Sequence, residues 1–412
     1  MEQNEFKIYN YRWVVISAFM LIVLMNQVLW ITFASITSTA TSFYKVSDMS
    51  IGMLSLSFML VYIVISVPAS WVIDTYGIHV AVGIGAALTG IFGILRGVFA
   101  ANYNLVLLMQ IGIAVGQPFI VNAMTTIAAH WFPIRERATA TGLGSLSVYL
   151  GIIFGLALTP WLTAHFGLVH MLLQYGIASL IAAILFLILV RERPQTPPCP
   201  PDQAERSLAL DGLKNIIRQR NFILLMVVFF IGLGVFNAVT TWIEDIIKPR
   251  HFSSIQAGII GGIMVVGGVV GAILIPPISD RLRKRVPFIF FALAGTIPGL
   301  IGITYATSYW LLLASAFLLG FCLLSAGPVG FQYGAEITYP APEGISNGMV
   351  MLMGQIAGII FIFGMDWLRL PVSGSMTYSL LILIGLVFIS MFVCTRLKES
   401  KMLTDNSPNN YL

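Results

Sequence analysis

Twelve long apolar runs constrain the fold of this 412-residue chain more than any other feature. A helix needs roughly 20 apolar residues to cross a hydrocarbon layer about 30 Å thick. Each run must be helical, because lipid offers the backbone no hydrogen-bond partner. We therefore predict an all-α membrane protein with twelve transmembrane helices. The predicted spans are 13–40, 50–73, 79–100, 104–129, 138–162, 168–190, 221–247, 255–279, 286–306, 308–335, 344–369 and 376–395.

Composition supports a chain dissolved in lipid. Hydrophobic residues make up 58% of the sequence and charged residues only 9%, whereas about a quarter of an ordinary globular protein is charged. A soluble protein would have to bury this whole apolar surface in one hydrophobic core. Single cores of soluble proteins do not extend beyond about 250–300 residues. The class of large soluble proteins is excluded on this ground.

Lysine and arginine fall mainly in alternate loops, on the side that holds the N-terminus. The loops of the opposite side hold Lys45, Lys248, Arg250 and Arg369. Cytoplasmic loops carry an excess of Lys and Arg, so we predict that both termini are cytoplasmic. The net charge of +5 then reflects membrane topology, and no nucleic-acid partner is expected.

Catalytic and metal-ligand patterns do not occur in the sequence. The three cysteines are scattered, and the five histidines fall near span ends without a partner at metal-ligand spacing. An intramembrane enzyme would need a nucleophile, a base or metal ligands at bilayer depth. We predict no enzyme activity, no metal and no cofactor.

A polar, proline-rich stretch at residues 191–220 separates six spans from six. It predicts six-helix bundles at 1–190 and 221–412, joined by this cytoplasmic linker. The two halves also repeat one another, since Asp74 and Asp280 occupy matching loop positions 206 residues apart. Six plus six spans in parallel halves resemble the major facilitator architecture, in which the solute site lies near the midplane between the halves.

Two prolines within spans extend the repeat. Pro118 in span four and Pro328 in span ten are 210 positions apart. Interrupted helices in matching positions indicate a solute site, because broken backbone is tolerated in lipid only where protein or a cavity surrounds it. We therefore predict helix breaks at both prolines and expect spans four and ten to line the path.

Charged residues gather at the predicted inner loops of both halves. Carboxylates in such loops can pair with arginine or cap a neighbouring helix N-terminus, and breaking those contacts would let the halves move. The basic residues also fit simple positive-inside topology, which is the alternative reading. The predicted gating residues are Asp74, Asp280, Arg135, Arg137, Glu136 and Glu343.

Polar groups inside spans are expensive, so each suggests a function. Mid-span amides also bind helices together in bundles, which is the competing explanation for Asn26, Gln27 and Asn122. Arg96 lies near the end of span three, and we expect its long side chain to reach the headgroups. Trp30 lies just past the centre of span one, away from the interfacial belt where tryptophan is commonest.

Several strings are similar to those of one transporter family. They are FQYGAEITYP at 331–340, EGISNG at 343–348, YRWVV at 11–15 and WVIDT at 71–75. With Trp30 in span one, they make the chain resemble the feline leukaemia virus subgroup C receptor (FLVCR) family over nearly its whole length. The resemblance implies facilitated transport of choline, ethanolamine or a related small amine, and haem has also been proposed for the family.

The resemblance also implies a set of solute-binding residues. In the family an aromatic residue of span one, a glutamine of span four, an aromatic residue of span seven and a glutamine of span eleven surround choline. Trp30, Gln117 and Gln355 stand at three of these places, and Asn237 replaces the span-seven aromatic residue. One lost aromatic face weakens the match to a quaternary ammonium, while the amide suits a solute with hydroxyl or carbonyl groups. Other residues that could complete the cage are Phe236, Tyr149 and Tyr333.

We therefore predict an alternating-access transporter of a small organic solute, most simply a uniporter. Glu336 is the residue best placed to couple protons instead. The alternatives are a broad-specificity or haem exporter, a proton-coupled carrier of another metabolite, and a solute-sensing receptor. Short outer loops without glycosylation sequons favour a prokaryotic inner membrane over another plasma membrane. We expect a monomer whose partners are its solute and the lipid bilayer.

Overall fold

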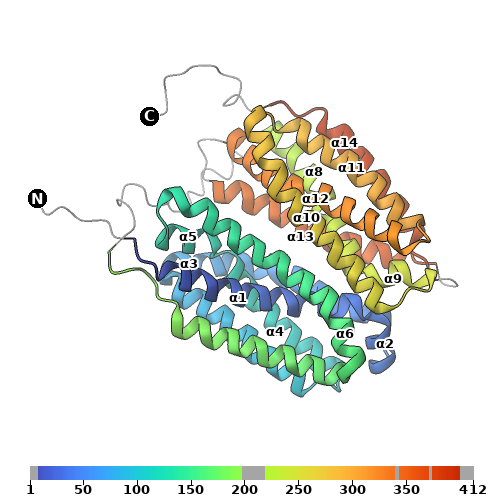
Figure 1. Cartoon of the computed structure of the whole chain (residues 1–412), viewed down its shortest axis with the longest axis horizontal. Coiled ribbons are helices and arrows are strands. Elements are labelled where there is room, and N and C mark those ends of the chain that lie inside the picture. Colours follow the sequence, from blue (N-terminus) through green and yellow to red (C-terminus); the bar gives the residue numbers. More distant parts are fainter. Residues whose placement is uncertain (1–7, 197–218, 339–342, 371–373, 400–412) are drawn as a thin grey trace, which may run out of the picture. The chain divides into compact units, whose positions relative to one another are not determined.

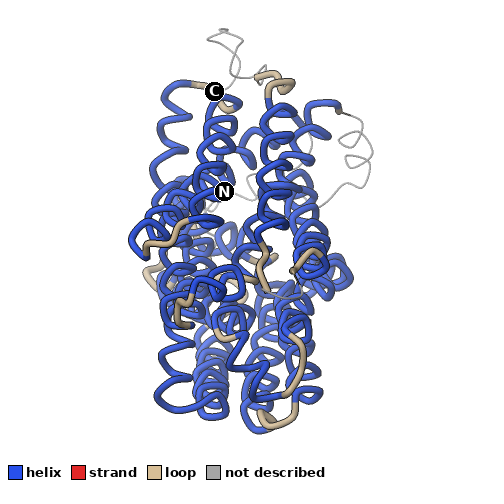
Figure 2. The backbone as a smooth tube through the Cα atoms, turned by 90° about the vertical axis from the view of Figure 1, so that its right-hand side faces the viewer, coloured by secondary structure: helices blue, strands red, loops and turns tan. Residues whose placement is uncertain are grey.

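The computed structural model describes residues 8–196, 219–338, 343–370 and 374–399. In these ranges every regular element is a helix (Figure 2). The elements of the first half are α1 (Arg12–Ile31), η1 (Thr32–Ser35), α2 (Thr37–Tyr44), α3 (Asp48–Val98), α4 (Tyr103–Val121), α5 (Met124–Trp131) and α6 (Ile134–Leu189). Those of the second half are α8 (Arg220–Thr241), α9 (Ile243–Ile247), η3 (Lys248–Arg250), α10 (Ser254–Leu282), α11 (Val286–Tyr305), α12 (Tyr309–Thr338), α13 (Glu343–Trp367) and α14 (Thr377–Cys394).

Two of these helices each contain two spans joined at a glycine. α3 turns at Gly77, with φ of 84° and ψ of 175°, and α6 turns at Gly167, with φ of 79° and ψ of 161°. This backbone region is essentially restricted to glycine. The described residues contain 11 apolar stretches long enough to cross a membrane, and one of them, Ala140–Leu189, contains the turn at Gly167. The predicted twelve-helix fold is therefore confirmed.

The chain divides into two compact units, Met1–Ser207 and Leu208–Leu412. The division falls within the stretch predicted to link the two bundles. We refer to them as unit 1 and unit 2.

In unit 1, α3 packs against α4 and α6, and α1 packs along α6 (Figure 1). Large apolar side chains such as Phe19, Ile22 and Phe186 are fully enclosed between them. Other apolar side chains point outward, among them Val67, which is 76% exposed. Apolar residues on both sides of a helix are expected where the outer face meets lipid and packing holds the inner face.

Unit 2 is built in the same way. α12 packs against α10 and α11, and α8 packs against α13. Phe222, Leu300 and Tyr333 are enclosed, whereas Phe291 and Trp310 are exposed.

The matched helix breaks lie in spans one and seven, not in spans four and ten. In span one, α1 ends at Ile31 and α2 begins at Thr37 after a 3₁₀ turn. In span seven, α8 ends at Thr241 and α9 begins at Ile243, which is 206 positions after Thr37. By the rule that broken helices in matching positions indicate the solute path, these two spans are its best markers.

The breaks predicted at Pro118 and Pro328 are wrong in position. α12 runs without interruption through Pro328, and α4 continues past Pro118. A transmembrane helix tolerates proline when neighbouring groups satisfy the freed backbone. Span four is interrupted at Asn122, whose side-chain amide donates to the hydroxyls of Ser66 and Ser70, each at 3.1 Å.

Candidate functional site

Unit 1 contributes three of the predicted solute-binding residues. Trp30 lies in the last turn of α1, is 7% exposed, and donates from Nε1 to the Ser55 carbonyl oxygen at 3.2 Å. The indole nitrogen is thus engaged within the protein. Gln117 of α4 and Tyr149 of α6 make no side-chain hydrogen bond to the described residues. Both keep free hydrogen-bonding capacity.

Unit 2 contributes a second group of these residues, on α8 and α13. Asn237 Nδ2 donates to the Gly354 carbonyl oxygen at 3.2 Å, so the structure brings Asn237 beside the backbone that precedes Gln355. The Gln355 side chain is partly buried and forms no hydrogen bond within the described part of the chain. Phe236, next to Asn237 on α8, is 5% exposed.

Tyr333 does not share this setting. Its side chain is fully enclosed, and its hydroxyl donates to the Lys398 carbonyl oxygen at 2.6 Å. A ring and hydroxyl engaged in this way present no surface to a solute. We therefore leave Tyr333 out of the proposed solute-binding set.

Of the predicted gating side chains, the structure describes only that of Glu136. Glu136 Oε2 lies 3.2 Å from Nε of Arg12, at the start of α1. The sequence did not indicate Arg12 as the partner. The side chains of the other members, which are Asp74, Asp280, Arg135, Arg137 and Glu343, lie outside the described residues.

A carboxylate that the sequence analysis missed caps the third span of unit 1. Glu192 follows α6, and its Oε2 accepts the backbone N–H of His79 at 2.8 Å, just after the turn at Gly77. Its other oxygen lies 3.5 Å from Nδ1 of His130. Burial raises the pKa of Glu192, but hydrogen bonds from His130 and from the backbone of His79 and Ile78 outweigh it, so the net pKa is lowered.

Unit 2 repeats this carboxylate cap. Glu399 follows α14 and accepts the backbone N–H groups of Arg285 at 3.1 Å and Val286 at 3.0 Å, at the start of α11. Glu192 and Glu399 are 207 positions apart. This spacing differs by one position from the 206-residue offset of the two loop aspartates, so a search of the repeat that allows one position of slack finds this pair.

Glu336, the predicted coupling residue, is held in an ion pair. Its Oε1 lies 3.0 Å from Nη2 of Arg285, and both side chains are more than nine-tenths buried. Oε1 also accepts from Nε2 of Gln332 at 3.2 Å. These contacts connect the residue that precedes α11 to α12.

Arg96 corrects a further prediction. We expected its side chain to reach the headgroups, but it is fully buried within unit 1. Nη1 donates to Oε1 of Gln110 at 2.6 Å and to the Leu29 carbonyl oxygen at 3.0 Å. These partners on α4 and α1 hold the guanidinium inside the protein.

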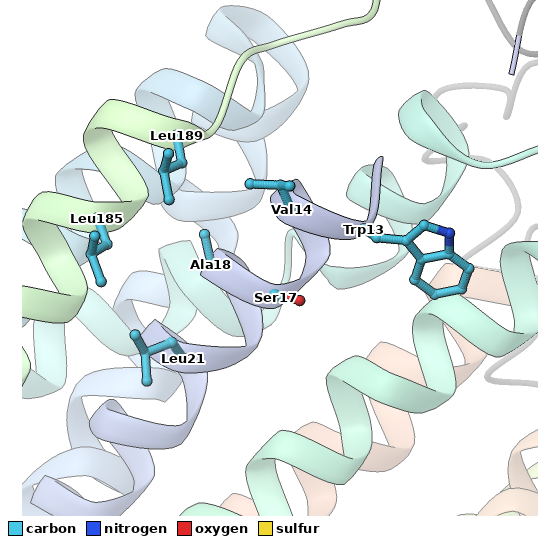
Figure 3. A pocket seen from close by; sticks show the side chains of 7 residues that line it. All are labelled: Trp13, Val14, Ser17, Ala18, Leu21, Leu185 and Leu189. Carbon is cyan, nitrogen blue, oxygen red and sulfur yellow. The ribbon is translucent and has the colours of Figure 1, made fainter. Parts of the chain in front are cut away.

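An open groove of about 430 Å³ lies on unit 1, between the start of α1 and the end of α6 (Figure 3). Its lining contains one polar side chain and none of the predicted solute-binding residues. It fits an apolar surface bathed by lipid, and we assign it no role in transport. The lining residues are Trp13, Val14, Ser17, Ala18, Leu21, Leu185 and Leu189.

Comparison with solved structures shows the fold. The chain is similar to a bacterial homologue of the human lysosomal transporter Spinster in its inward-facing, unoccupied conformation, with a TM-score of 0.75 and 16% identity, covering 98% of this chain and 100% of that one. It is also similar to the nucleoside transporter NupG, with a TM-score of 0.72 and 15% identity, over 97% of this chain and 100% of that one.

Comparison of sequences shows the family. The profile of the Major Facilitator Superfamily matches residues 15–362. The chain is 31% identical to choline/ethanolamine transporter FLVCR1 of Mus terricolor, over 85% of this chain and 68% of the relative. It is 29% identical to solute carrier family 49 member A3 of Xenopus tropicalis, over 91% of this chain and 81% of the relative. The chain is thus a multi-pass membrane transporter and not an enzyme, and it belongs to the FLVCR family of the Major Facilitator Superfamily.

Proposed function

We propose that this protein carries a small amine by facilitated uniport and that it prefers a primary amine such as ethanolamine to choline. The observation that carries the proposal is the free hydrogen-bonding capacity of Gln117 and Gln355. Both amides stand in spans without a partner in the described residues, and polar groups at such positions are expensive unless a function retains them. The relatives named as choline/ethanolamine transporters support the same class of solute.

The preference for a primary amine follows from the headgroup chemistry. The ammonium of ethanolamine has three N–H donors, whereas the trimethylammonium of choline has none and depends on aromatic faces worth roughly 0.5–2 kcal/mol each. The side-chain oxygens of Gln117, Gln355 and Asn237 can accept such donors. Asn237 uses its nitrogen on the Gly354 carbonyl, which leaves its oxygen available.

Two aromatic rings, those of Trp30 and Phe236, can contact an ammonium group whether it is primary or quaternary. Trp30 precedes the break in span one, and Phe236 lies five residues before the end of α8, where span seven breaks. An amide at Asn237 in place of a third ring shifts the balance from ring contact toward hydrogen bonding.

Uniport is supported by the state of the acidic residues. Proton coupling places a titratable group along the solute path. Glu336 is engaged by Arg285, and Glu244 accepts from Ser254 Oγ at 2.6 Å. Glu336 lies in α12, and Glu244 lies in α9, beyond the break in span seven.

Uptake of radiolabelled ethanolamine and choline into proteoliposomes tests the solute. We expect saturable uptake of both, with a higher Vmax/KM for ethanolamine. Asn237→Phe should move the ratio toward choline by about tenfold, since one good cation–π contact is worth that much. Asn237→Gln keeps the amide and serves as the matched control, with the ratio nearly unchanged. Uptake of neither amine above the level of protein-free liposomes would overturn the proposal.

A second measurement tests uniport. A uniporter of a cation responds to membrane potential, so an inside-negative potential set with valinomycin should increase ethanolamine uptake. A pH gradient of either sign, with the potential clamped, should leave the initial rate unchanged. Solute-linked proton movement, seen with an entrapped pH dye, would show coupled transport instead.

A further inference from the structure

The end of α1 is held by an unusual buried cation. Arg96 of α3 is fully enclosed, and its Nη1 donates to the Leu29 carbonyl oxygen at 3.0 Å and to Gln110 Oε1 at 2.6 Å. Gln110 Nε2 donates to the same Leu29 oxygen at 3.1 Å. Three spans of unit 1 therefore meet at one backbone carbonyl.

No carboxylate among the described residues pairs with Arg96, and its Nε and Nη2 have no hydrogen-bond partner there. A buried cation without a counterion needs another source of compensation. The C-terminal end of a helix provides one, because its last carbonyls lack intrahelical partners and carry partial negative charge. α1 ends at Ile31, so the Leu29 carbonyl belongs to this end. The Phe33 ring, 5.7 Å from the Arg96 guanidinium carbon, adds a further favourable face.

Trp30 follows Leu29 directly. Its indole donates to the Ser55 carbonyl, and the 3₁₀ turn of Thr32–Ser35 begins two residues later. Thr32 Oγ1 donates to the Val28 carbonyl oxygen at 2.7 Å. The carbonyls of the Val28–Leu29 and Leu29–Trp30 peptides are thus both bonded by side chains, so the direction in which Trp30 leaves the helix depends on these bonds.

We propose that Arg96 and Gln110 are positioning residues that fix the break in span one and thereby hold the Trp30 ring in the orientation that recognises the solute. The inference rests on the proposed function, in which Trp30 contacts the amine. A purely structural role is the competing explanation. That explanation predicts that a well-packed apolar pair at these two positions would preserve both stability and transport. Replacing both partners of a buried polar interaction with apolar groups is often neutral or stabilising.

The double variant Arg96→Met with Gln110→Leu separates the two explanations. It removes both side chains together, so neither is left buried without the other, and the Leu29 carbonyl oxygen loses these two donors. We expect it to purify as a folded protein with a Tm no higher than that of the wild type, while KM for radiolabelled ethanolamine rises about tenfold and Vmax stays within about twofold. The single variant Arg96→Lys keeps the charge and a hydrogen-bond donor. Its KM should therefore rise less than that of the double variant.

Thr89→Val is the matched control. Asn26 Nδ2 donates to Thr89 Oγ1 at 3.1 Å, another buried contact between α1 and α3 but away from the helix end. We expect this variant to lower Tm without changing KM. A double variant that is folded and keeps the wild-type KM would overturn the inference.

A spectroscopic readout follows Trp30 without transport. Because the chain has eight tryptophans, the emission of Trp30 is obtained as the difference between each protein and its Trp30→Phe version. The difference spectrum of the double variant should shift to longer wavelength as the indole leaves its buried bond. An unshifted spectrum contradicts positioning.

Failure of the inference and failure of the proposed function give different results. If Trp30→Leu leaves KM for ethanolamine unchanged, Trp30 does not recognise the solute and the proposed function loses that residue. If Trp30→Leu raises KM while the folded double variant does not, the positioning role alone is wrong.

Discussion

The two units begin their third span with the same carboxylate cap but place different basic residues beside it. In unit 1, Glu192 accepts the His79 backbone N–H and lies 3.5 Å from the His130 ring nitrogen. In unit 2, Glu399 accepts the backbone N–H groups of Arg285 and Val286. The positive end of a helix dipole meets a negative charge in both.

The neighbouring charges differ in kind. Arg285 is permanently charged and also pairs with the buried Glu336, whereas a histidine is charged only when protonated. The repeat has kept the cap and changed the basic residue beside it. The charge of Glu192 itself, whose pKa is lowered by its hydrogen bonds, is therefore the quantity to test in unit 1.

Breaking the Arg285–Glu336 pair should have the largest effect. Arg285→Met leaves the Glu336 carboxylate buried without its cation, which costs about 3–5 kcal/mol. We expect a Tm far below that of the wild type in detergent. The double variant Arg285→Met with Glu336→Leu should recover much of this loss, and a single variant as stable as the wild type would contradict the ion-pair assignment.

The turn glycines sharpen the comparison within unit 1. Gly77 and Gly167 have nearly the same glycine-only backbone, so alanine at either should cost about 1–3 kcal/mol. A Cβ at Gly77 would also clash with the Glu192 carboxylate, whereas a Cβ at Gly167 meets no atom within 4 Å. We expect the Tm of Gly77→Ala to fall further than that of Gly167→Ala. Equal losses would mean that Glu192 moves aside at no cost.

Removing the charge of either cap should have a smaller effect. Glu399→Gln and Glu192→Gln retain the shape of the side chain but weaken its hydrogen bonds to backbone N–H groups, at about 0.5–2 kcal/mol. The Glu192 side chain is 36% exposed, so solvent screening should place the stability loss of Glu192→Gln at the lower end of this range. Thermal unfolding of both variants at neutral pH measures the difference, and a larger loss in Glu192→Gln would reverse the expected order.

The sequence predicted the fold well because its signals are strong. Apolar runs in lipid admit few structures, and the observed helix ends lie close to the predicted spans. The predicted positions of the helix breaks were wrong. A proline shows only where a backbone N–H is missing, and a transmembrane helix can continue past such a position. The break after Ile31 depends instead on partners from other spans, such as Arg96, which no local pattern reveals.

The candidate site was predictable in part. Resemblance indicated Trp30, Gln117 and Gln355, and the two amides have no hydrogen-bond partner in the described residues. Tyr333 was placed among them because an aromatic residue within a span suits a cation. Its bond to the Lys398 carbonyl depends on the fold of the chain after α14, and no spacing in the sequence indicates such a contact.

The pH dependence of unit 1 gives the smallest expected effect and the most direct test of the comparison. The pKa of Glu192 is lowered on folding from an ordinary value of 4.5. The stabilisation that results is fully present above that ordinary value, and it is lost as pH falls through the lowered folded-state pKa. Other carboxylates titrate in the same range, so the informative quantity is the Tm of the wild type minus that of Glu192→Gln.

We expect this Tm difference to stay constant from about pH 7 to pH 5.5, and to shrink as the pH is lowered below the ordinary carboxylate value. His130→Leu removes the side-chain partner that helps to lower the pKa of Glu192. In that background the loss should be smaller and should be complete at a higher pH, because the folded-state pKa lies closer to the ordinary value. A Tm difference that does not vary with pH would mean that the pKa of Glu192 stays at its ordinary value. The Glu192 cap would then contribute nothing to the difference between the two units.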